Sequence, residues 1–180
     1  TRDLFWIYGA LRDARQRFPD HRTYADASIA EVIGPRFSRA EQLEINTVET
    51  MIFLNRTTSF KARPLPIEAQ FSTAQGVTVA DFNGDGAQDI FLSQNFFAVQ
   101  IEDTRSDAGR GLMLNGKGDG SFVAMSGATS GIKVYGEQRA SATADYNRDG
   151  RPDLLVTQNG AQTKLYRNLA GKPGLRVKLL

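Results

Sequence analysis

Asp81-Phe82-Asn83-Gly84-Asp85-Gly86-Ala87-Gln88-Asp89 is an acidic loop that returns 64 residues later as Asp145-Tyr146-Asn147-Arg148-Asp149-Gly150-Arg151-Pro152-Asp153. Each copy places oxygen-bearing side chains at loop positions 1, 3, 5 and 9 and a glycine at position 6. In such an arrangement a turning backbone wraps hard oxygen ligands around one cation. The duplicated loop therefore predicts two Ca²⁺ sites.

Electrostatics favour a cation within each loop, because three carboxylates this close in sequence repel one another. An asparagine side chain and a backbone carbonyl at position 7 add neutral oxygens. Neither loop contains histidine or sulfur, so an oxygen-preferring ion is favoured over zinc or copper. The predicted ligands are Asp81, Asn83, Asp85, the Ala87 carbonyl and Asp89 in the first loop, and Asp145, Asn147, Asp149, the Arg151 carbonyl and Asp153 in the second.

Two other interpretations of the loops were considered. An EF-hand loop also begins Asp-x-Asn-x-Asp-Gly, but its bidentate glutamate would fall at Leu92 and Val156, and the flanking residues have the pattern of strands. The other interpretation is a polar turn held by Asx hydrogen bonds, without a metal. The presence of two matching copies favours metal sites over plain turns.

The loops belong to a longer duplication, in which Gln94-Asn95 after the first loop returns as Gln158-Asn159 after the second. Short apolar runs broken by Gly, Asn and Asp surround both copies, and Asn115 to Gly120 has the glycines of a tight hairpin. A period near 60 residues is typical of propeller blades. We therefore expect a mainly β fold, a partial β-propeller of about two to three blades of antiparallel strands, at about residues 45–110 and 111–162 with the start of a third at 163–180.

The segment 1–44 has a different pattern and is expected to be helical. Apolar residues from Leu4 to Phe18 recur at helical spacing until Pro19. A second helix is predicted from Thr23, with Asp26 as a capping partner, to Gly34, and a short third helix from Ser38 to Leu43. We expect these helices to pack against a core through their apolar faces.

Composition narrows the functional classes. The chain has 180 residues, 41% of them hydrophobic, a formal charge of +2 and no cysteine. Disulfides and a cysteine nucleophile are excluded, and the near-neutral charge does not favour nucleic acid as a partner. No apolar run is long enough for a transmembrane helix. Because the sequence begins at Thr1 without a signal-like segment, we expect a processed product or a piece of a longer protein.

The loops resemble the FG-GAP or VCBS-type repeats of integrin-like propellers. Together with Tyr135-Gly136-Glu137-Gln138-Arg139 and Lys164-Leu165-Tyr166-Arg167-Asn168, they resemble more narrowly the ASPIC/UnbV (cartilage acidic protein-like) group, over about residues 50–180. The ending Gly174 to Leu179 is similar to the entry into the ASPIC/UnbV domain. This resemblance implies a seven-bladed, calcium-stabilised propeller that is secreted, periplasmic or surface-exposed and acts in adhesion or as a scaffold. It carries no catalytic residue set.

The function expected is therefore a non-enzymatic calcium-binding repeat scaffold for a protein or carbohydrate partner, in an extracytoplasmic location. Because so few blades cannot close a propeller, we expect the chain to be part of a longer protein, or its open edges to be covered by the helical segment or another chain. One alternative is a subunit of a larger, membrane-peripheral assembly, docked through the helical segment or residues 95–111. Another is an accessory part of a glycan-active enzyme, with acids drawn from Glu102, Asp103, Asp107 or Glu137.

Overall fold

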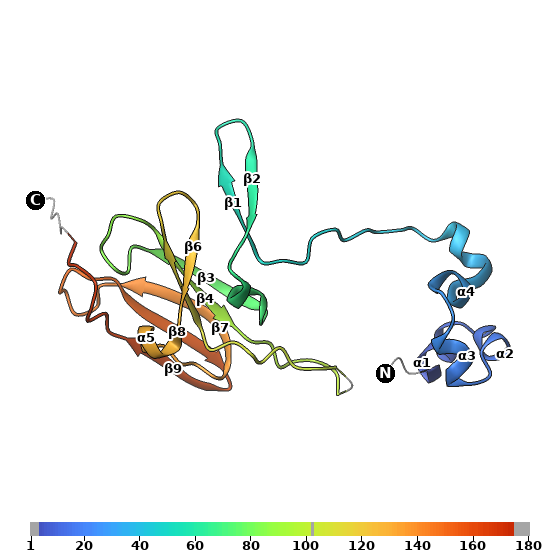
Figure 1. Ribbon diagram of the computed structural model, residues 1–180. Helices are drawn as coiled ribbons and strands as arrows, with labels where there is room; N and C mark the ends of the chain where they lie inside the picture. Colours follow the sequence, from blue (N-terminus) through green and yellow to red (C-terminus); the bar gives the residue numbers. More distant parts are fainter. Residues whose placement is uncertain (1–3, 102, 175–180) are drawn as a thin grey trace, which may run out of the picture. The chain divides into compact units, whose positions relative to one another are not determined.

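The computed structural model describes residues 4–101 and 103–174. The chain divides into two compact units, Thr1–Thr47 and Val48–Leu180. The described residues contain nine strands in three antiparallel sheets, all in the second unit, and only short helices (Figure 1). The prediction of a mainly β fold is confirmed.

The first unit consists of short helices around one small core. Their bounds are α1 Leu4–Ala10, α2 Ala14–Arg17, α3 His21–Ala25, α4 Ile29–Ile33 and the 3₁₀ helix η1 Gly34–Arg39. The core is built from Leu4, Ala14, Phe18, Tyr24 and Val32. Each of the four α-helices contributes one buried apolar side chain and Phe18 follows α2, so tertiary packing stabilises helices that are too short to persist alone.

The helix boundaries differ from those predicted, and local caps account for the starts of α3 and α4. The predicted helix from Leu4 to Phe18 is two helices with a turn between them. The predicted helix from Thr23 is also two: the Asp20 carboxylate caps α3 by accepting the Thr23 N–H at 2.8 Å, and Ser28 and Glu31 form a capping box on α4. The helix predicted from Ser38 to Leu43 is absent, since η1 ends at Arg39 and residues 40–47 have no helix.

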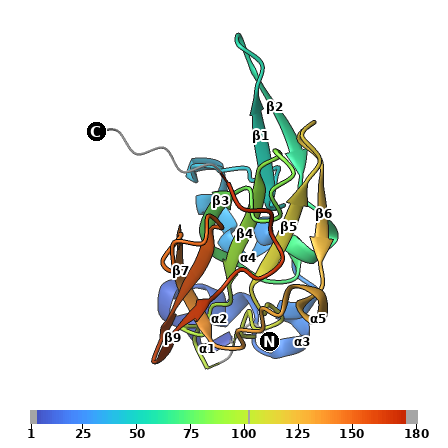
Figure 2. The ribbon, with the colours of Figure 1, turned by 90° about the vertical axis from the view of Figure 1, so that its left-hand side faces the viewer.

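The second unit begins with the hairpin of β1 Met51–Asn55 and β2 Phe60–Pro64, which projects from the rest of this unit in Figures 1 and 2. The 3₁₀ helix η2 Ile67–Gln70 follows it. The four-stranded sheet has the order β3-β4-β5-β6, and the three-stranded sheet has the order β7-β8-β9. Their elements are β3 Ala74–Ala80, β4 Asp89–Gln94, β5 Leu112–Gly116, β6 Phe122–Met125, α5 Gly127–Ser130, β7 Glu137–Ala144, β8 Asp153–Asn159 and β9 Ala161–Tyr166.

The hairpin predicted at residues 115–120 is confirmed as the β5–β6 connection, where Gly118 and Gly120 have φ of 77° and 83°. The four-stranded sheet runs from residue 74 to residue 125, so it includes strands from both sides of residue 110, where the sequence pattern places a blade boundary. Among the described residues the sheets do not close into a ring. The propeller and its number of blades therefore stay predictions.

The two larger sheets correspond at the 64-residue offset. The β3–β4 ladder has a register shift between Ala74 and Gly76, and the β7–β8 ladder has one between Gln138 and Ala140. All residues of β4 are buried, because clusters of apolar side chains cover both faces of its sheet. Phe91 packs between the two sheets, whereas Ile90 and Leu92 pack against Leu65 on the opposite face. This double coverage fixes the position of the first acidic loop, which leads directly into β4.

Candidate metal-binding loops

The first acidic loop connects β3 to β4 and is folded around the carboxylate of Asp81. This carboxylate accepts the backbone N–H groups of Gly84, Asp85 and Gly86 at 2.7, 3.1 and 2.8 Å. Gly84 and Gly86 have φ of 72° and 91°, which is the left-handed conformation that glycine adopts without strain. The loop is therefore a tight turn whose backbone amides point at its first acidic side chain.

The second loop, between β7 and β8, repeats two of these three contacts. The Asp145 carboxylate accepts the N–H groups of Asp149 and Gly150, each at 2.9 Å. In both loops the asparagine at position 3 donates its side-chain amide to the aspartate at position 5 at 2.9 Å. One difference lies at position 4, where an arginine, Arg148, replaces Gly84 and adopts a similar positive φ of 62°. The same sequence pattern thus gives the same local fold twice.

The aspartates at position 9 connect each loop to a distant strand. Asp89 accepts the N–H of Phe82 at 3.0 Å and that of Gly116, at the end of β5, at 2.9 Å. Asp153 likewise accepts the N–H of Tyr146 at 3.2 Å and that of Asn168, just after β9, at 2.8 Å. Both carboxylates are buried. Each one therefore holds its loop to the strand that follows the loop's own hairpin.

The loops differ in how their negative charge is balanced. In the second loop Asp149 forms ion pairs with Arg151 and Arg167, each at 3.3 Å. Hydrogen bonding from Asn147, with these arginines, lowers the pKa of Asp149. In the first loop burial raises the pKa of Asp89, against the opposing effect of its backbone hydrogen bonds. Within the described part of the chain, no arginine or lysine forms an ion pair with Asp89.

The Asp85 carboxylate, at position 5 of the first loop, is stabilised by hydrogen bonds. The Ala87 N–H that it accepts at 2.8 Å, followed by the Asn83 amide, lowers its pKa, and the charges of Lys117 and Lys172 act in the same direction. These hydrogen bonds stabilise the ionised form without a direct ion pair. Less of the negative charge of the first loop is therefore neutralised by ion pairs than that of the second loop.

Each loop gathers its own predicted ligands into one turn. Within residues 4–101 and 103–174, however, no three Asp, Glu, His or Cys side chains converge as a ligand group for a metal ion. The carboxylates instead accept backbone N–H groups, as in Asx turns. The donor set still fits calcium in chemical type, since it consists of oxygen atoms and includes the buried carboxylate Asp89. Coordination would require the oxygens of the loop to converge, which these hydrogen bonds permit because each carboxylate oxygen has a second lone pair.

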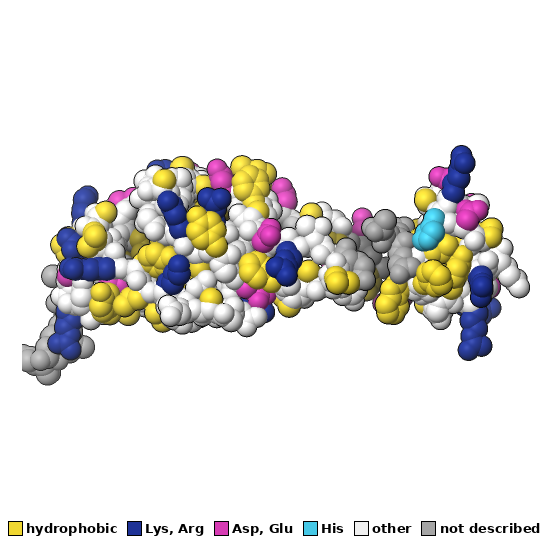
Figure 3. Space-filling model, turned by 90° about the horizontal axis from the view of Figure 1, so that it is seen from below, with side chains coloured by type: hydrophobic (Ala, Val, Ile, Leu, Met, Phe, Trp, Pro, Cys, Tyr) yellow, Lys and Arg dark blue, Asp and Glu magenta, His cyan; other side chains and the backbone are white. Residues whose placement is uncertain are grey.

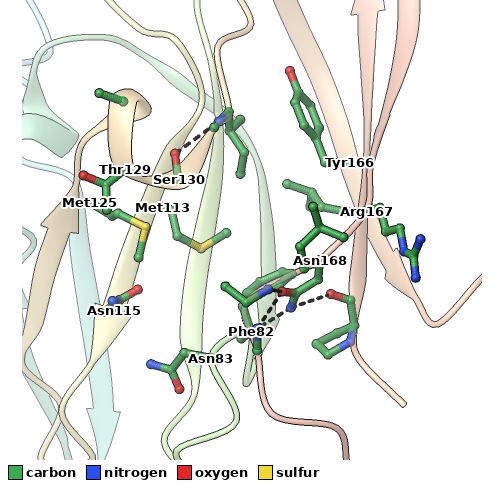
Figure 4. Close-up of a pocket in the computed structure, with 18 residues that line it drawn as sticks. Phe82, Asn83, Met113, Asn115, Met125, Thr129, Ser130, Tyr166, Arg167 and Asn168 are labelled. Carbon is green, nitrogen blue, oxygen red and sulfur yellow. Dashed lines mark hydrogen bonds between the residues drawn. The ribbon is translucent and has the colours of Figure 1, made fainter. Parts of the chain in front are cut away.

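A cavity of about 540 Å³ adjoins the first loop and was not predicted from the sequence. Figure 4 shows Met113 and Met125 on one side of it and Tyr166 on the other, with Asn83 of the loop at one end. Its walls come from both large sheets and from the segment after β9. Asn168 closes one side by donating to the Phe82 carbonyl at 2.7 Å. No sequence motif marks this cavity, because only the packing of the two sheets brings its walls together.

No hydrogen bond joins the described acidic residues that were considered for catalysis. Glu137 accepts the Phe97 N–H at 3.0 Å and the Asn159 amide at 2.7 Å and pairs with Arg139 at 3.1 Å. The Phe97 hydrogen bond is the main cause of its lowered pKa. Asp103 and Asp107 are exposed, and Glu102 lies outside the described residues. These contacts favour a structural role for Glu137.

Residues 95–111, the insert between β4 and β5, are closed at their base by a residue that sequence reasoning missed. Asn95 is buried with a φ of 85°. Its side chain accepts the Gly109 N–H at 2.8 Å and donates to the Gly109 carbonyl at 2.9 Å and to the Gly136 carbonyl at 3.1 Å. Asn95 thereby clamps both ends of the insert to the start of β7. Its place in the duplicated Gln-Asn pair was the only sequence signal.

No helix in the described part of the chain combines the length and apolarity needed to cross a lipid bilayer.

Comparison with known proteins gives one partial similarity. No family model matches the chain. The chain is 29% identical over 109 residues to cartilage acidic protein 1 of Xenopus tropicalis, a match that covers 59% of this chain. The chain spans 15% of the length of that relative. The similarity agrees with the group that the loop motifs resemble.

Proposed function

We propose that the chain is a non-enzymatic, calcium-binding repeat scaffold that presents its surfaces to a protein or carbohydrate partner. The observation that carries the proposal is the first loop, where the buried Asp89 carboxylate has backbone amides as partners and no ion pair with a described side chain. A buried carboxylate without a counter-charge is costly even where amides bond to it, and a bound cation reduces that cost. The other predicted ligands of the loop are also oxygen atoms, which favours calcium.

Calcium would be held in the first loop by the side chains of Asp81, Asn83, Asp85 and Asp89 and the Ala87 carbonyl. When bound, it would supply positive charge between carboxylates that otherwise repel. Because the unfolded chain has no such site, the binding free energy would add to the free energy of folding. The cation would thus stabilise the connection between β3 and β4, and no reacting group is needed for this role.

The second loop supports the same proposal less strongly. Its predicted ligands are Asp145, Asn147, Asp149, the Arg151 carbonyl and Asp153, but Arg151 and Arg167 already neutralise Asp149. A cation there would have to compete with two guanidinium groups. We therefore propose a tighter site in the first loop and a weaker site in the second.

The propeller architecture, the FG-GAP or VCBS repeat type and an extracytoplasmic location form part of the proposal. The similarity to cartilage acidic protein 1 supports them, together with the corresponding loops and register shifts of the two large sheets. Calcium is abundant outside cells, where modules with dissociation constants of about 10⁻⁴ to 10⁻³ M are occupied.

Calorimetric titration of the chelator-treated full chain with CaCl₂ tests the proposal. We expect two binding events, the tighter one lost in Asp81→Asn and Asp85→Asn, and a melting temperature that rises with calcium. Asp103→Asn, an exposed acid outside the loops, is the matched control and should retain both events. The proposal fails if the wild-type chain gives no binding heat up to about 5 mM calcium, above the range for extracellular modules, and melts at the same temperature in EDTA.

A second candidate function is a subunit of a larger assembly. It is favoured by large apolar side chains that are exposed on the strands of the second unit, including Phe53 on β1, Phe60 on β2 and Val77 on β3. Exposed apolar side chains mark interfaces where they form a contiguous surface. Sedimentation of the isolated chain at several concentrations separates this function from that of a monomeric scaffold.

A further inference from the structure

Asparagine is followed by glycine at three places in the chain: Asn83-Gly84, Asn115-Gly116 and Asn159-Gly160. Asparagine is chemically labile. It loses its side-chain amide most readily before glycine, because a residue without a Cβ leaves its own backbone nitrogen open to attack the preceding side chain. The reaction requires that this nitrogen is free and that the turn has room to move. The structure separates the three pairs on both requirements.

Two of the pairs hold the glycine nitrogen in a hydrogen bond to a carboxylate. The Gly84 N–H donates to Asp81 at 2.7 Å, inside the first acidic loop. The Gly116 N–H donates to Asp89 at 2.9 Å, and Gly116 is buried. Hydrogen bonds to an ionised acceptor are the stronger kind, so attack by either nitrogen must first break a strong contact. The fold therefore protects Asn83 and Asn115.

The third pair forms the turn between β8 and β9. Asn159 is the last residue of β8, and β9 begins at Ala161. Asn159 and Gly160 are both exposed, and a side chain at Gly160 would meet nothing within 4 Å. Among the described residues, no hydrogen bond holds the Gly160 N–H. The attacking nitrogen is thus free, and the turn around it is open.

The duplication supplies a further comparison, because Asn95 occupies the position of Asn159 in the first Gln-Asn pair. Asn95 is buried, and its side-chain amide donates to the carbonyls of Gly109 and Gly136. Its following residue is Phe96, whose side chain hinders approach of the backbone nitrogen. The combination of an exposed asparagine and an unhindered nitrogen is therefore particular to the second copy.

We propose that Asn159 is a site of spontaneous deamidation in the folded chain. The Gly160 nitrogen forms a bond to the side-chain carbonyl carbon of Asn159, and the bond from that carbon to the amide nitrogen breaks. Ammonia leaves with the proton of the Gly160 N–H, which produces a cyclic succinimide. Water then opens the ring at either carbonyl and gives aspartate or isoaspartate. The only co-reactant is water, and the modification does not depend on calcium in the loops.

The modification changes a contact that holds the base of the insert at residues 95–111. The Asn159 amide donates to one oxygen of the buried Glu137 carboxylate at 2.7 Å, and the other oxygen accepts the Phe97 N–H at 3.0 Å. On the face in Figure 3, Asp and Glu side chains of the β-rich unit lie scattered among Lys and Arg side chains. A carboxylate formed at residue 159 would instead face that of Glu137, and like charges this close repel. Deamidation therefore weakens the attachment of the insert to β7.

Peptide mapping by mass spectrometry, after incubation of the full chain at physiological temperature and mildly alkaline pH, tests the proposal. The amide-to-acid mass change should appear at Asn159 at least about tenfold faster than at Asn83 or Asn115. The same chain in urea is the control, because the three pairs should convert there at similar rates. The proposal is overturned if Asn159 does not convert in the folded chain, or if Asn83 or Asn115 converts as fast. The same ranking and ratio of rates in urea would also overturn it, since the fold would then protect neither pair.

Two variants test the effect on Glu137. Asn159→Ser removes the labile amide, whereas Asn159→Asp reproduces one product of the reaction. Both lose the amide donor, but only the second adds a charge opposite Glu137, so Asn159→Asp should have the lower melting temperature at neutral pH. Asn46→Asp, the same chemical change at an exposed residue outside the sheets, is the matched control and should melt like the wild type. Equal melting temperatures for the two variants at residue 159 would contradict the assigned repulsion.

Discussion

The two acidic loops share a pattern of residues and a backbone fold, yet they are set in different electrostatic surroundings. In the second loop arginines pair with Asp149, whereas its equivalent in the first loop, Asp85, forms no ion pair with a described residue. The position-9 carboxylates Asp89 and Asp153 are both buried and both satisfied by backbone amides. The residue after the first aspartate is buried in one loop and exposed in the other. The comparison teaches that a ligand motif specifies the shape of a turn, while the residues around it decide whether the turn carries unbalanced charge.

The largest expected effect comes from removing a position-9 carboxylate. Asp89→Ala leaves the Phe82 and Gly116 N–H groups without an acceptor in a buried position, so the free energy of unfolding should fall by about 2–4 kcal/mol in the absence of calcium. Urea denaturation measures this change. Asp119→Ala in the exposed β5–β6 turn, where the carboxylate accepts from Ser121, should cost about 1 kcal/mol or less. Equal losses for the two variants would contradict the assigned role of Asp89.

The glycines of the first loop should respond unequally to substitution. A side chain at Gly84 would collide with the backbone of Lys172, whereas one at Gly86 would meet nothing within 4 Å. Both residues have positive φ, so Gly86→Ala should cost about 1 kcal/mol from backbone strain alone, and Gly84→Ala about 2–3 kcal/mol. Thermal or urea unfolding of the two variants measures the difference. Similar costs would mean that the segment after β9 does not press on the loop.

Removing the arginines should make the second loop resemble the first. Arg151→Gln with Arg167→Gln frees Asp149 from both ion pairs, and calcium affinity at that loop should rise by about three- to tenfold, with the first loop unchanged. Calorimetric titration resolves the two events. Arg105→Gln, which removes a similar charge far from the loops in sequence, is the control. An unchanged second affinity would show that these arginines do not limit binding.

The smallest effect expected is a pH dependence of opposite sign for the two loops. Burial raises the pKa of Asp89 in the folded state, so without calcium the folded chain binds more protons and its stability rises as the pH falls through the raised value towards the ordinary aspartate pKa. The pKa of Asp149 is lowered, so its contribution is present above the ordinary aspartate pKa and is lost as the pH falls through its folded value. Urea denaturation at several pH values tests both signs: Asp89→Asn should remove the first trend only, and Asp149→Asn the second only.

Local structure was predictable from the sequence where the residues that determine it lie close together in the chain. The strands at Met51 and Ile90 and the hairpin with Gly118 and Gly120 follow from short apolar runs and glycine positions, and all of them form. The helix predictions failed where Ser28 caps a new start inside a continuous apolar pattern and where Asp20, not Thr23, caps α3. A cap contributes enough to divide a helix when the core can be built from shorter pieces.

The sequence could not predict contacts that depend on the register of distant strands. Asp89 bonds to a residue 27 positions along the chain and Asp153 to one 15 positions along, so no fixed spacing identifies either partner. The cavity beside Met113 and Tyr166 depends on how the two sheets pack. The same holds for the charge balance of the loops, since Arg167 lies outside the motif that it neutralises.

The clamp at Asn95 has a consequence for redesign of the chain. Its bonds to Gly109 hold the two ends of the insert together, and the Asp89 bond to Gly116 holds β5 independently of what lies between. The residues inside the clamp can therefore be exchanged for a foreign peptide, because closing a loop of different length on fixed ends changes the folding free energy only slowly with length. This makes residues 98–105 a natural position for grafting a binding loop, with the sheet and the Phe96–Ser106 bridge serving as its rigid base.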